Sequence, residues 1–273
     1  KTKDILKMGS TQRATQYTYL PGKTAGTTTT QVGTVTYADG TVETYTYDER
    51  GYISSIHSSG DNKKVEYTYD TLGQLVREDN ERENYTVTWE YDKGGNLLSR
   101  KVYAYTTGST LGEPLSTDIY GYNDAAWGDL LTSYNGQTIT YDTIGNPLSY
   151  RGAALTWKAG RQLAAWSKDG TNVSYQYDDS GIRTKKVVNG ETTEYYILDG
   201  TLLGMSGKVD SLPYTLVFRF DEGGNAIGFQ LTVSGYGTQA YWYQRNLQGD
   251  VIGLYNGSGT LIGRYTYDAW GKL

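Results

Sequence analysis

The chain has 273 residues, with 28 tyrosines and 35 glycines against 3 phenylalanines, 2 methionines and 4 prolines, a mixture that favours many strands joined by glycine turns over helices. The formal net charge is -5, and lysine and arginine are scattered along the chain, which is evidence against a nucleic-acid partner. No apolar run reaches the roughly 18 residues that a membrane-spanning helix needs, and the lack of cysteine excludes disulfides, thiolate metal sites and a thiol nucleophile.

The N-terminal segment 1–34 reads as an irregular or partial repeat. Its first residues, KTKDILKMGS, lack the apolar stretch and cleavage site of a signal peptide, and residues 21–33, PGKTAGTTTTQVG, are turn-rich and of low complexity. The chain starts without Met and stops abruptly at YDAWGKL. We therefore expect a fragment of a longer protein, so the lack of a targeting signal in this stretch says nothing about the whole protein.

A unit Tyr-Asp-x-x-Gly recurs along the rest of the chain, with a period of 22 residues where it is clean. Looser copies lie around Tyr122, Trp157, Phe220 and Tyr243. The strict copies are Tyr47-Asp48-Gly51, Tyr69-Asp70-Gly73, Tyr91-Asp92-Gly95, Tyr141-Asp142-Gly145, Tyr177-Asp178-Gly181 and Tyr267-Asp268-Gly271.

Each unit predicts a β-hairpin, as the copy at residues 67–75 illustrates. Tyr67 and Tyr69 alternate with Thr68, so both rings project from one face of a strand. The carboxylate of Asp70 is placed to accept hydrogen bonds from the amides just ahead, and Gly73 supplies the positive φ that closes the turn. The return strand then opens with an aliphatic residue, here Leu75.

The predicted fold class is all-β. Successive hairpins pair edge to edge into one long antiparallel sheet with a tyrosine-rich face and a polar face. Because strands twist and sheets beyond roughly ten strands curl, split or close, we expect the sheet to coil into a spiral, a partial shell or a barrel. Tyrosine suits a half-wet inner face, since its ring packs against neighbours while its hydroxyl finds water or another strand.

The repeats YTYDTLGQLV, YDTIGNPLSY and YQYDDSGIRTKK resemble those of YD-repeat (RHS-repeat) proteins. The last stretch, YWYQRNLQGDVIGLYNGSGTLIGRYTYDAWGKL, is similar to the start of the RHS-associated core. On this basis we divide the chain into the N-terminal segment 1–34, a YD-repeat sheet at 35–240 and the start of the core at 241–273.

The resemblance implies a β-sheet spiral that winds into a hollow, non-enzymatic shell. In bacterial members the shell encloses a C-terminal toxin, and in animal teneurins a similar shell belongs to an adhesion ectodomain. The implied partner is thus a C-terminal toxin domain of the same parent chain, and the implied location is outside the bacterial cell or on its surface. The Asp-Pro self-cleavage motif of the family is not in this sequence, so no autoprotease residues are carried over. A chain of this length is expected to form a partial wall, whose open edges favour self-association.

The repeated aspartates favour a turn role over calcium binding or catalysis, because they recur once per hairpin whereas an enzyme needs one or two special acids. The run DEGGN at 221–225 resembles part of a calcium loop but lacks the later glutamate. His57 is the only histidine, and we expect it to be an exposed residue near a strand end. With one histidine and no cysteine, no metal site and no cofactor are predicted.

Two other functions stay open at this point. A pair among the 30 acidic residues would serve glycoside hydrolysis, although nothing singles a pair out. Alternatively, exposed aromatic rings would bind cell-wall glycan or a surface protein. Trp127, Trp166, Trp242 and Trp270 are not all on the regular alternation, and Trp242, between two tyrosines, is the candidate glycan contact.

Overall fold

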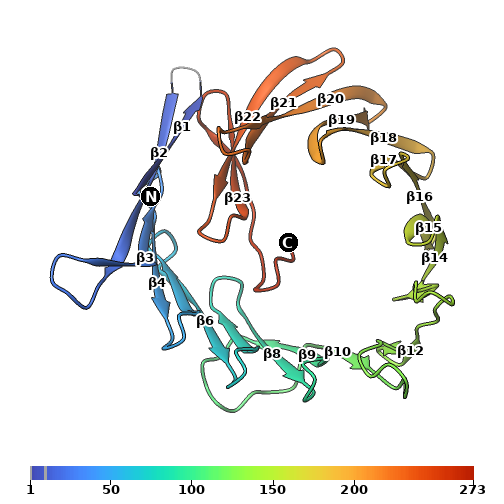
Figure 1. Cartoon of the computed structure of the whole chain (residues 1–273). Coiled ribbons are helices and arrows are strands. Elements are labelled where there is room, and N and C mark those ends of the chain that lie inside the picture. The colour runs from blue at the N-terminus through green and yellow to red at the C-terminus, as the bar shows by residue number, and fades with distance from the viewer. Residues whose placement is uncertain (1, 9–10) are drawn as a thin grey trace. The chain divides into compact units, whose positions relative to one another are not determined.

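The computed structural model describes residues 2–8 and 11–273, and among these residues every regular element is a strand. The strands form two 12-stranded sheets in which neighbours in the sequence are neighbours in the sheet. Figure 1 shows the strands following one another from the blue to the red end of the chain. Every pairing given below is antiparallel, so the prediction of an all-β fold made of consecutive hairpins is confirmed.

The first sheet runs in the order β1 to β12. Its strands are β1 (Lys3–Met8), β2 (Thr11–Pro21), β3 (Thr28–Thr36), β4 (Val42–Tyr47), β5 (Ile53–Ser58), β6 (Lys63–Tyr69), β7 (Leu75–Asn80), β8 (Tyr85–Tyr91), β9 (Leu97–Ala104), β10 (Ser116–Gly121), β11 (Ser133–Tyr134) and β12 (Gln137–Thr138).

The second sheet runs in the order β13 to β24. Its strands are β13 (Ser149–Tyr150), β14 (Ala153–Lys158), β15 (Gln162–Lys168), β16 (Thr171–Tyr177), β17 (Arg183–Val188), β18 (Glu191–Leu198), β19 (Thr201–Val209), β20 (Leu212–Phe220), β21 (Ala226–Val233), β22 (Gly237–Arg245), β23 (Val251–Asn256) and β24 (Leu261–Arg264).

The division into two sheets corrects the expectation of one unbroken sheet. The interruption falls where strands β11, β12 and β13 have only two residues each. The sequence here loses its alternation at GYNDAAWGD, and Pro147 has no N–H to give to a ladder. Between β12 and β13 the chain forms an isolated bridge, Tyr141 to Pro147, and the Leu148 amide donates to the Thr140 carbonyl at 2.7 Å.

Two compact units share the chain, one made mainly of residues 12–136 and the other of residues 137–273. The first unit holds most of the closed core, with Val35, Tyr45, Val87 and Trp89 at most 2% exposed. In the second unit the corresponding face is half-exposed along most strands. Each unit is therefore considered by itself below.

The N-terminal segment is more regular than its composition predicts. In the described part of residues 1–34, which omits 1, 9 and 10, the chain forms β1, β2 and the start of β3. The phenol of Tyr17 donates to Asp4 at 2.9 Å, linking the first two strands. The boundaries at 34 and 240 remain predictions.

The low-complexity loop before β10 is held in place by polar contacts. The Arg77 guanidinium donates to the carbonyls of Thr106 and Gly108 at 2.8 and 2.9 Å, and its Nε donates to Asp79 at 2.8 Å. Thr86 also donates to the Thr106 carbonyl, at 2.9 Å. These bonds tie the loop to β7 and β8. Among the described residues no helix is long and apolar enough to span a membrane.

Candidate functional site

The Tyr-Asp-x-x-Gly turn has one geometry wherever it is strict, and the turn at Asp70 is typical. Its carboxylate Oδ1 accepts from the amides of Leu72 and Gln74, both at 2.9 Å. The Gly73 amide donates to the Asp70 carbonyl at 3.1 Å, and the Asp70 amide donates to the Gln74 carbonyl at 3.0 Å. One aspartate thus satisfies amides that a tight turn leaves without a ladder partner.

The glycine of each strict turn lies in the left-handed region, where a side chain is strained. The φ angles are 90° at Gly51, 84° at Gly73, 90° at Gly95, 85° at Gly145, 82° at Gly181 and 75° at Gly271. In each of these turns the glycine amide donates to the carbonyl of the aspartate three residues earlier.

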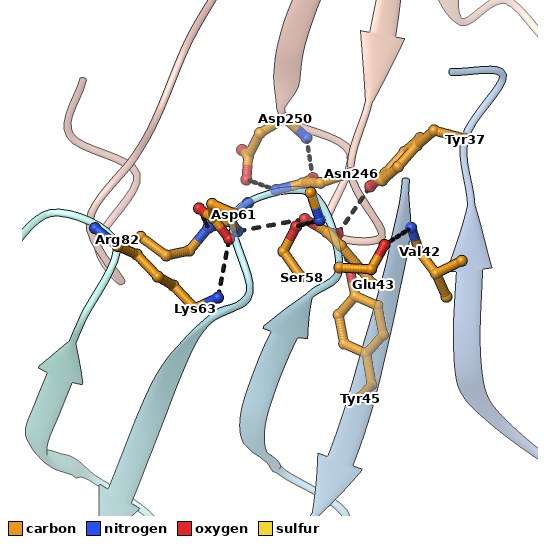
Figure 2. Close-up of polar contacts among 12 residues, drawn as sticks. Tyr37, Val42, Glu43, Tyr45, Ser58, Asp61, Lys63, Arg82, Asn246 and Asp250 are labelled. Carbon is orange, nitrogen blue, oxygen red and sulfur yellow. Dashed lines mark hydrogen bonds and ion pairs between the residues drawn. The ribbon is translucent and has the colours of Figure 1, made fainter. Parts of the chain in front are cut away.

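Asparagine replaces aspartate in two looser copies without changing the turn. Asn246 accepts the Asp250 amide at 2.8 Å and returns a side-chain bond to the Asp250 carboxylate at 2.9 Å; Figure 2 labels both residues. Asn256 accepts the amides of Ser258 and Thr260. Since an amide oxygen serves as well as a carboxylate, negative charge is dispensable at this position.

Hydrogen bonding lowers the pKa of turn carboxylates, as Asp92 and Asp142 illustrate. For Asp92 the main cause is the side-chain amide of Asn96, followed by the backbone amide of the same residue. For Asp142 it is the backbone amide of Asn146, whose side-chain amide adds to the effect. A carboxylate with a lowered pKa stays ionised at neutral pH, where it accepts hydrogen bonds and holds no proton to transfer.

In five of the strict copies the tyrosine of the turn also contacts the preceding hairpin. The phenol of Tyr69 donates to the carbonyl of Ile53 at 2.9 Å, and that of Tyr91 donates to the carbonyl of Leu75 at 3.0 Å. Equivalent bonds join Tyr47 to Val32 at 2.8 Å, Tyr177 to Leu163 at 2.9 Å and Tyr267 to Val251 at 2.9 Å. A phenylalanine at these positions would lack the bond, which accounts physically for the choice of tyrosine.

A buried carboxylate that the repeat pattern did not single out lies in the first unit. Glu43 is 6% exposed and accepts the phenols of Tyr37 and Tyr45 at 2.8 and 2.7 Å (Figure 2). Arg82 reaches the same carboxylate at 3.4 Å and also pairs with Asp61 at 3.1 Å. Glu43 is two residues before Tyr45, on the same strand face, so the alternation itself carried the signal that this glutamate faces inward.

The phenols around this carboxylate are held in the protonated form. Burial raises the pKa of Tyr37, and the charge of Glu43 raises it further. Burial likewise raises the pKa of Tyr67, with the charge of Glu78 as the next cause. A phenol with a raised pKa is a poor nucleophile, so this cluster is suited to holding strands together rather than to covalent catalysis.

The tryptophans considered as glycan contacts differ in exposure. Trp242 is 8% exposed, so a sugar ring would reach it only after neighbouring side chains moved. Trp127 and Trp270 are 54% and 57% exposed. Trp127 is held by its own loop, because Asp124 accepts the Trp127 amide at 2.8 Å. Whether any of them contacts a glycan stays a prediction.

His57 differs slightly from its expected position. It lies inside β5, opposite Thr44 on one side and Lys64 on the other, and is half-buried. Across the described residues no group of three or more histidine, cysteine, aspartate or glutamate side chains is arranged to hold a metal ion. A small cavity of about 290 Å³ in the second unit is lined by residues 137–139 and 149–154, which include Tyr150 and Arg151.

Comparison with known proteins gives the repeats a family context. Residues 3–108 match the family model described as the teneurin YD-shell. Over these residues the chain is similar to a teneurin YD-shell. This agrees with the repeated turns above, which continue beyond the matched residues to Gly271.

Two similar relatives are Bacillus proteins. This chain is 34% identical over 146 residues to the tRNA3(Ser)-specific nuclease WapA of Bacillus spizizenii, and 32% identical over 146 residues to the tRNA nuclease WapA of Bacillus subtilis. Each match covers 52% of this chain and 6% of the relative, so the chain spans a small part of their length.

A solved structure shares the fold. The crystal structure of TcdB2-TccC3-TEV superposes with a TM-score of 0.62 and 17% sequence identity, over 95% of this chain and 15% of that chain. At this identity the likeness establishes the β-sheet fold.

Proposed function

We propose that this YD-repeat chain is a non-enzymatic wall segment of a secreted or cell-surface protein, and that in the full protein the wall encloses and delivers a C-terminal toxin. The observation that carries the proposal is the half-exposed aromatic and aliphatic face of the second unit. Large exposed apolar faces mark interaction surfaces more often than they mark walls that face solvent.

The register of the strands shows how continuous this face is. Tyr195, Met205, Leu216 and Leu231 are successive partners across β18, β19, β20 and β21. Each of the four is half-buried, while Glu194 beside Tyr195 is exposed. A row of side chains in register on one face of four strands offers a continuous surface to a polypeptide on that side.

Aromatic contacts extend the same face in both directions. Phe229 and Tyr241 stack with ring centroids 4.9 Å apart. The Arg183 guanidinium lies 5.3 Å from the ring centroids of both Tyr175 and Tyr195. Such rings combine large contact area with a polar edge, which suits a surface that must adapt to a cargo.

Relatives support the delivery part of the proposal. The WapA proteins carry the names of tRNA nucleases, and the shared 146 residues are 6% of their length. We infer that their activity belongs to other parts of those proteins, and that the part shared with this chain supplies the wall.

Limited proteolysis of the full gene product tests this function. With the wall intact, we expect one polypeptide outside residues 1–273 to survive a protease concentration that digests the same polypeptide made alone. In a variant whose turns are broken, such as Gly73→Val, protection should be lost. Digestion at the same rate in the intact protein and alone would contradict the proposal.

Glycan recognition is the second candidate, favoured by the 54% exposure of Trp127. Isothermal titration against cell-wall oligosaccharides tests it. Saturable binding that is lost in Trp127→Ala and kept in Trp242→Ala would support a surface site, whereas loss only in Trp242→Ala would place the contact at the buried tryptophan. No heat with any sugar would rule the candidate out.

A further inference from the structure

The backbone ladder between successive hairpins ends before the YD turns are reached. Between β5 and β6 the last pair on the turn side is Ser55 with Glu66. Ile53 lies two residues before Ser55, and Tyr69 lies three residues after Glu66. The Tyr69 phenol donates to the Ile53 carbonyl at 2.9 Å, so a side chain supplies a hydrogen bond between the strands beyond the point where their backbone pairing ends. We call such a gap a seam.

The same count describes every tyrosine-to-carbonyl bond between hairpins given above. In each case the acceptor carbonyl belongs to the residue two positions before the last paired residue of the first strand. The donor side chain belongs to the residue three positions after the partner of that pair on the second strand. The last pairs are Thr34 with Thr44, Ser55 with Glu66, Arg77 with Thr88, Ala165 with Ser174 and Gly253 with Arg264. Five seams with one geometry indicate a structural rule of the repeat.

Two seams use a different side chain at the donor position. The last pair Ser149 with Ala154 places Trp157 as donor, and its indole Nε1 donates to the Pro147 carbonyl at 2.7 Å. The last pair Gly228 with Trp242 places Arg245 as donor. Its guanidinium donates to the Ala226 carbonyl at 2.8 Å. Both bonds satisfy the count without a tyrosine.

Two consecutive seams of the second unit have a hydrocarbon side chain at this position. The last pair Lys185 with Glu194 places Ile197 there, and the count gives Arg183 as the acceptor residue. The last pair Gly204 with Val217 places Phe220 there, and the count gives Leu202 as the acceptor residue. Neither side chain can donate a hydrogen bond.

We propose that the residue three positions beyond the last pair acts as a seam donor, and that tyrosine, tryptophan and arginine serve equally well at this position. The sheet then opens first at the seams of Ile197 and Phe220. At a seam with a donor, opening breaks a side-chain bond to a carbonyl of the preceding hairpin. At the two donor-free seams that cost is missing. This inference concerns how the wall is built and holds whether or not the wall encloses a cargo.

The exposure of nearby side chains agrees with a looser sheet at these seams. Leu198 and Leu203, beside the turn that joins β18 to β19, are 61% and 37% exposed, and Val217 is 48% exposed. Apolar side chains on both faces of these strands are exposed, so a smaller part of the sheet is buried here than in the first unit. Local opening is favoured where few apolar contacts resist it.

Hydrogen exchange of the full chain, followed by mass spectrometry, tests the proposal through a gained bond and a lost bond. Phe220→Tyr adds a donor opposite Leu202 and should slow exchange in the peptides containing Gly204 and Val217 about fivefold, the effect of one net hydrogen bond. Tyr69→Phe should speed exchange around Ser55 and Glu66 by a similar factor. Tyr236→Phe, at a 75% exposed ring, is the matched control and should change neither region.

The wild-type chain gives a third readout. Among the seams of the second unit, peptides around Lys185 and Glu194 should exchange faster than those around Ala165 and Ser174, whose seam Tyr177 closes. Unchanged exchange in Phe220→Tyr, or a Tyr69→Phe profile equal to that of Tyr236→Phe, would overturn the proposal.

Discussion

The phenol of Tyr69 and the carbonyl of Ile53, sixteen residues apart, join two successive hairpins where their backbones no longer pair. The hydrogen bond is 2.9 Å long and both residues are half-buried. In this chain the tyrosine of the repeat therefore acts between hairpins, while the aspartate and glycine act within the turn. The predictions below separate these two contributions.

Replacing a turn glycine should destabilise the protein strongly. Gly73 has φ 84°, and a Cβ there would lie 2.9 Å from the Tyr52 hydroxyl. A β-branched residue is strained at this φ, so Gly73→Val should lower the free energy of unfolding by at least about 2 kcal/mol. Gly112→Val, at an exposed glycine with open space around it, is the control for urea denaturation and should cost less than about 0.5 kcal/mol. Equal midpoints for the two variants would refute the assigned turn geometry.

Acid should weaken the turns through their carboxylates. The pKa of Asp92 is lowered in the folded state, so its contribution to stability is complete above the unfolded value of 3.8 and is lost as the pH falls through the lower folded pKa. Asp92→Asn keeps an oxygen acceptor, as Asn246 does, but cannot titrate. Urea denaturation at a series of pH values should show that the free energy of unfolding falls less steeply in acid for Asp92→Asn than for wild type. The same pH dependence in both proteins would contradict a contribution from the Asp92 carboxylate.

Alkaline solution should act on the buried phenols. The pKa of Tyr37 and that of Tyr67 are raised above the ordinary value of 10, so the stability they contribute is complete below that pH and is lost as the pH rises toward the folded values. Absorbance of the phenolate should therefore show a group of tyrosines that ionise only when the protein unfolds. In Tyr37→Phe this late group should shrink. A titration in which all tyrosines ionise together near pH 10 without unfolding would disagree with the buried cluster.

Removing the buried carboxylate should leave two phenols without their acceptor. Glu43→Ala removes the carboxylate to which the hydroxyls of Tyr37 and Tyr45 donate, and the loss of a hydrogen-bond partner at a buried polar group costs about 1 to 3 kcal/mol. We expect a loss of about 3 kcal/mol in thermal or urea denaturation. Adding Tyr37→Phe and Tyr45→Phe to Glu43→Ala should restore part of that loss, since the two hydroxyls that lost this acceptor are removed as well. A triple variant less stable than Glu43→Ala alone would contradict this explanation.

The local chemistry of the sequence predicts most of the hairpin architecture. Tyr67, Asp70 and Gly73 predict a strand, a turn and a return strand, because side-chain alternation and a positive φ are short-range properties of the chain. The interruption between the two sheets was not predicted, since it depends on several weak positions such as Pro147 acting together. The alternation places Glu43 on the same face as Tyr45, but its burial between the phenols of Tyr37 and Tyr45 depends on how the strands pack and was not predicted.

The partners of the seam donors lie beyond what one repeat can reveal. Arg245 precedes Asn246 as tyrosine precedes aspartate in the strict unit, but its acceptor, Ala226, belongs to the previous hairpin and is not indicated by the repeat. Only the register of two strands makes the count visible. Whether Trp127 or Trp242 meets a glycan is likewise a question about a ligand, and the sequence pattern carries no answer to it.

Electron cryomicroscopy of the full gene product is the most direct test of the proposed wall. The account predicts that the aromatic face of β14 to β23 lies against density of a second polypeptide segment, while the opposite face meets solvent. A map in which that aromatic face is open to solvent in the intact, full-length protein would contradict the claim that these repeats enclose a cargo.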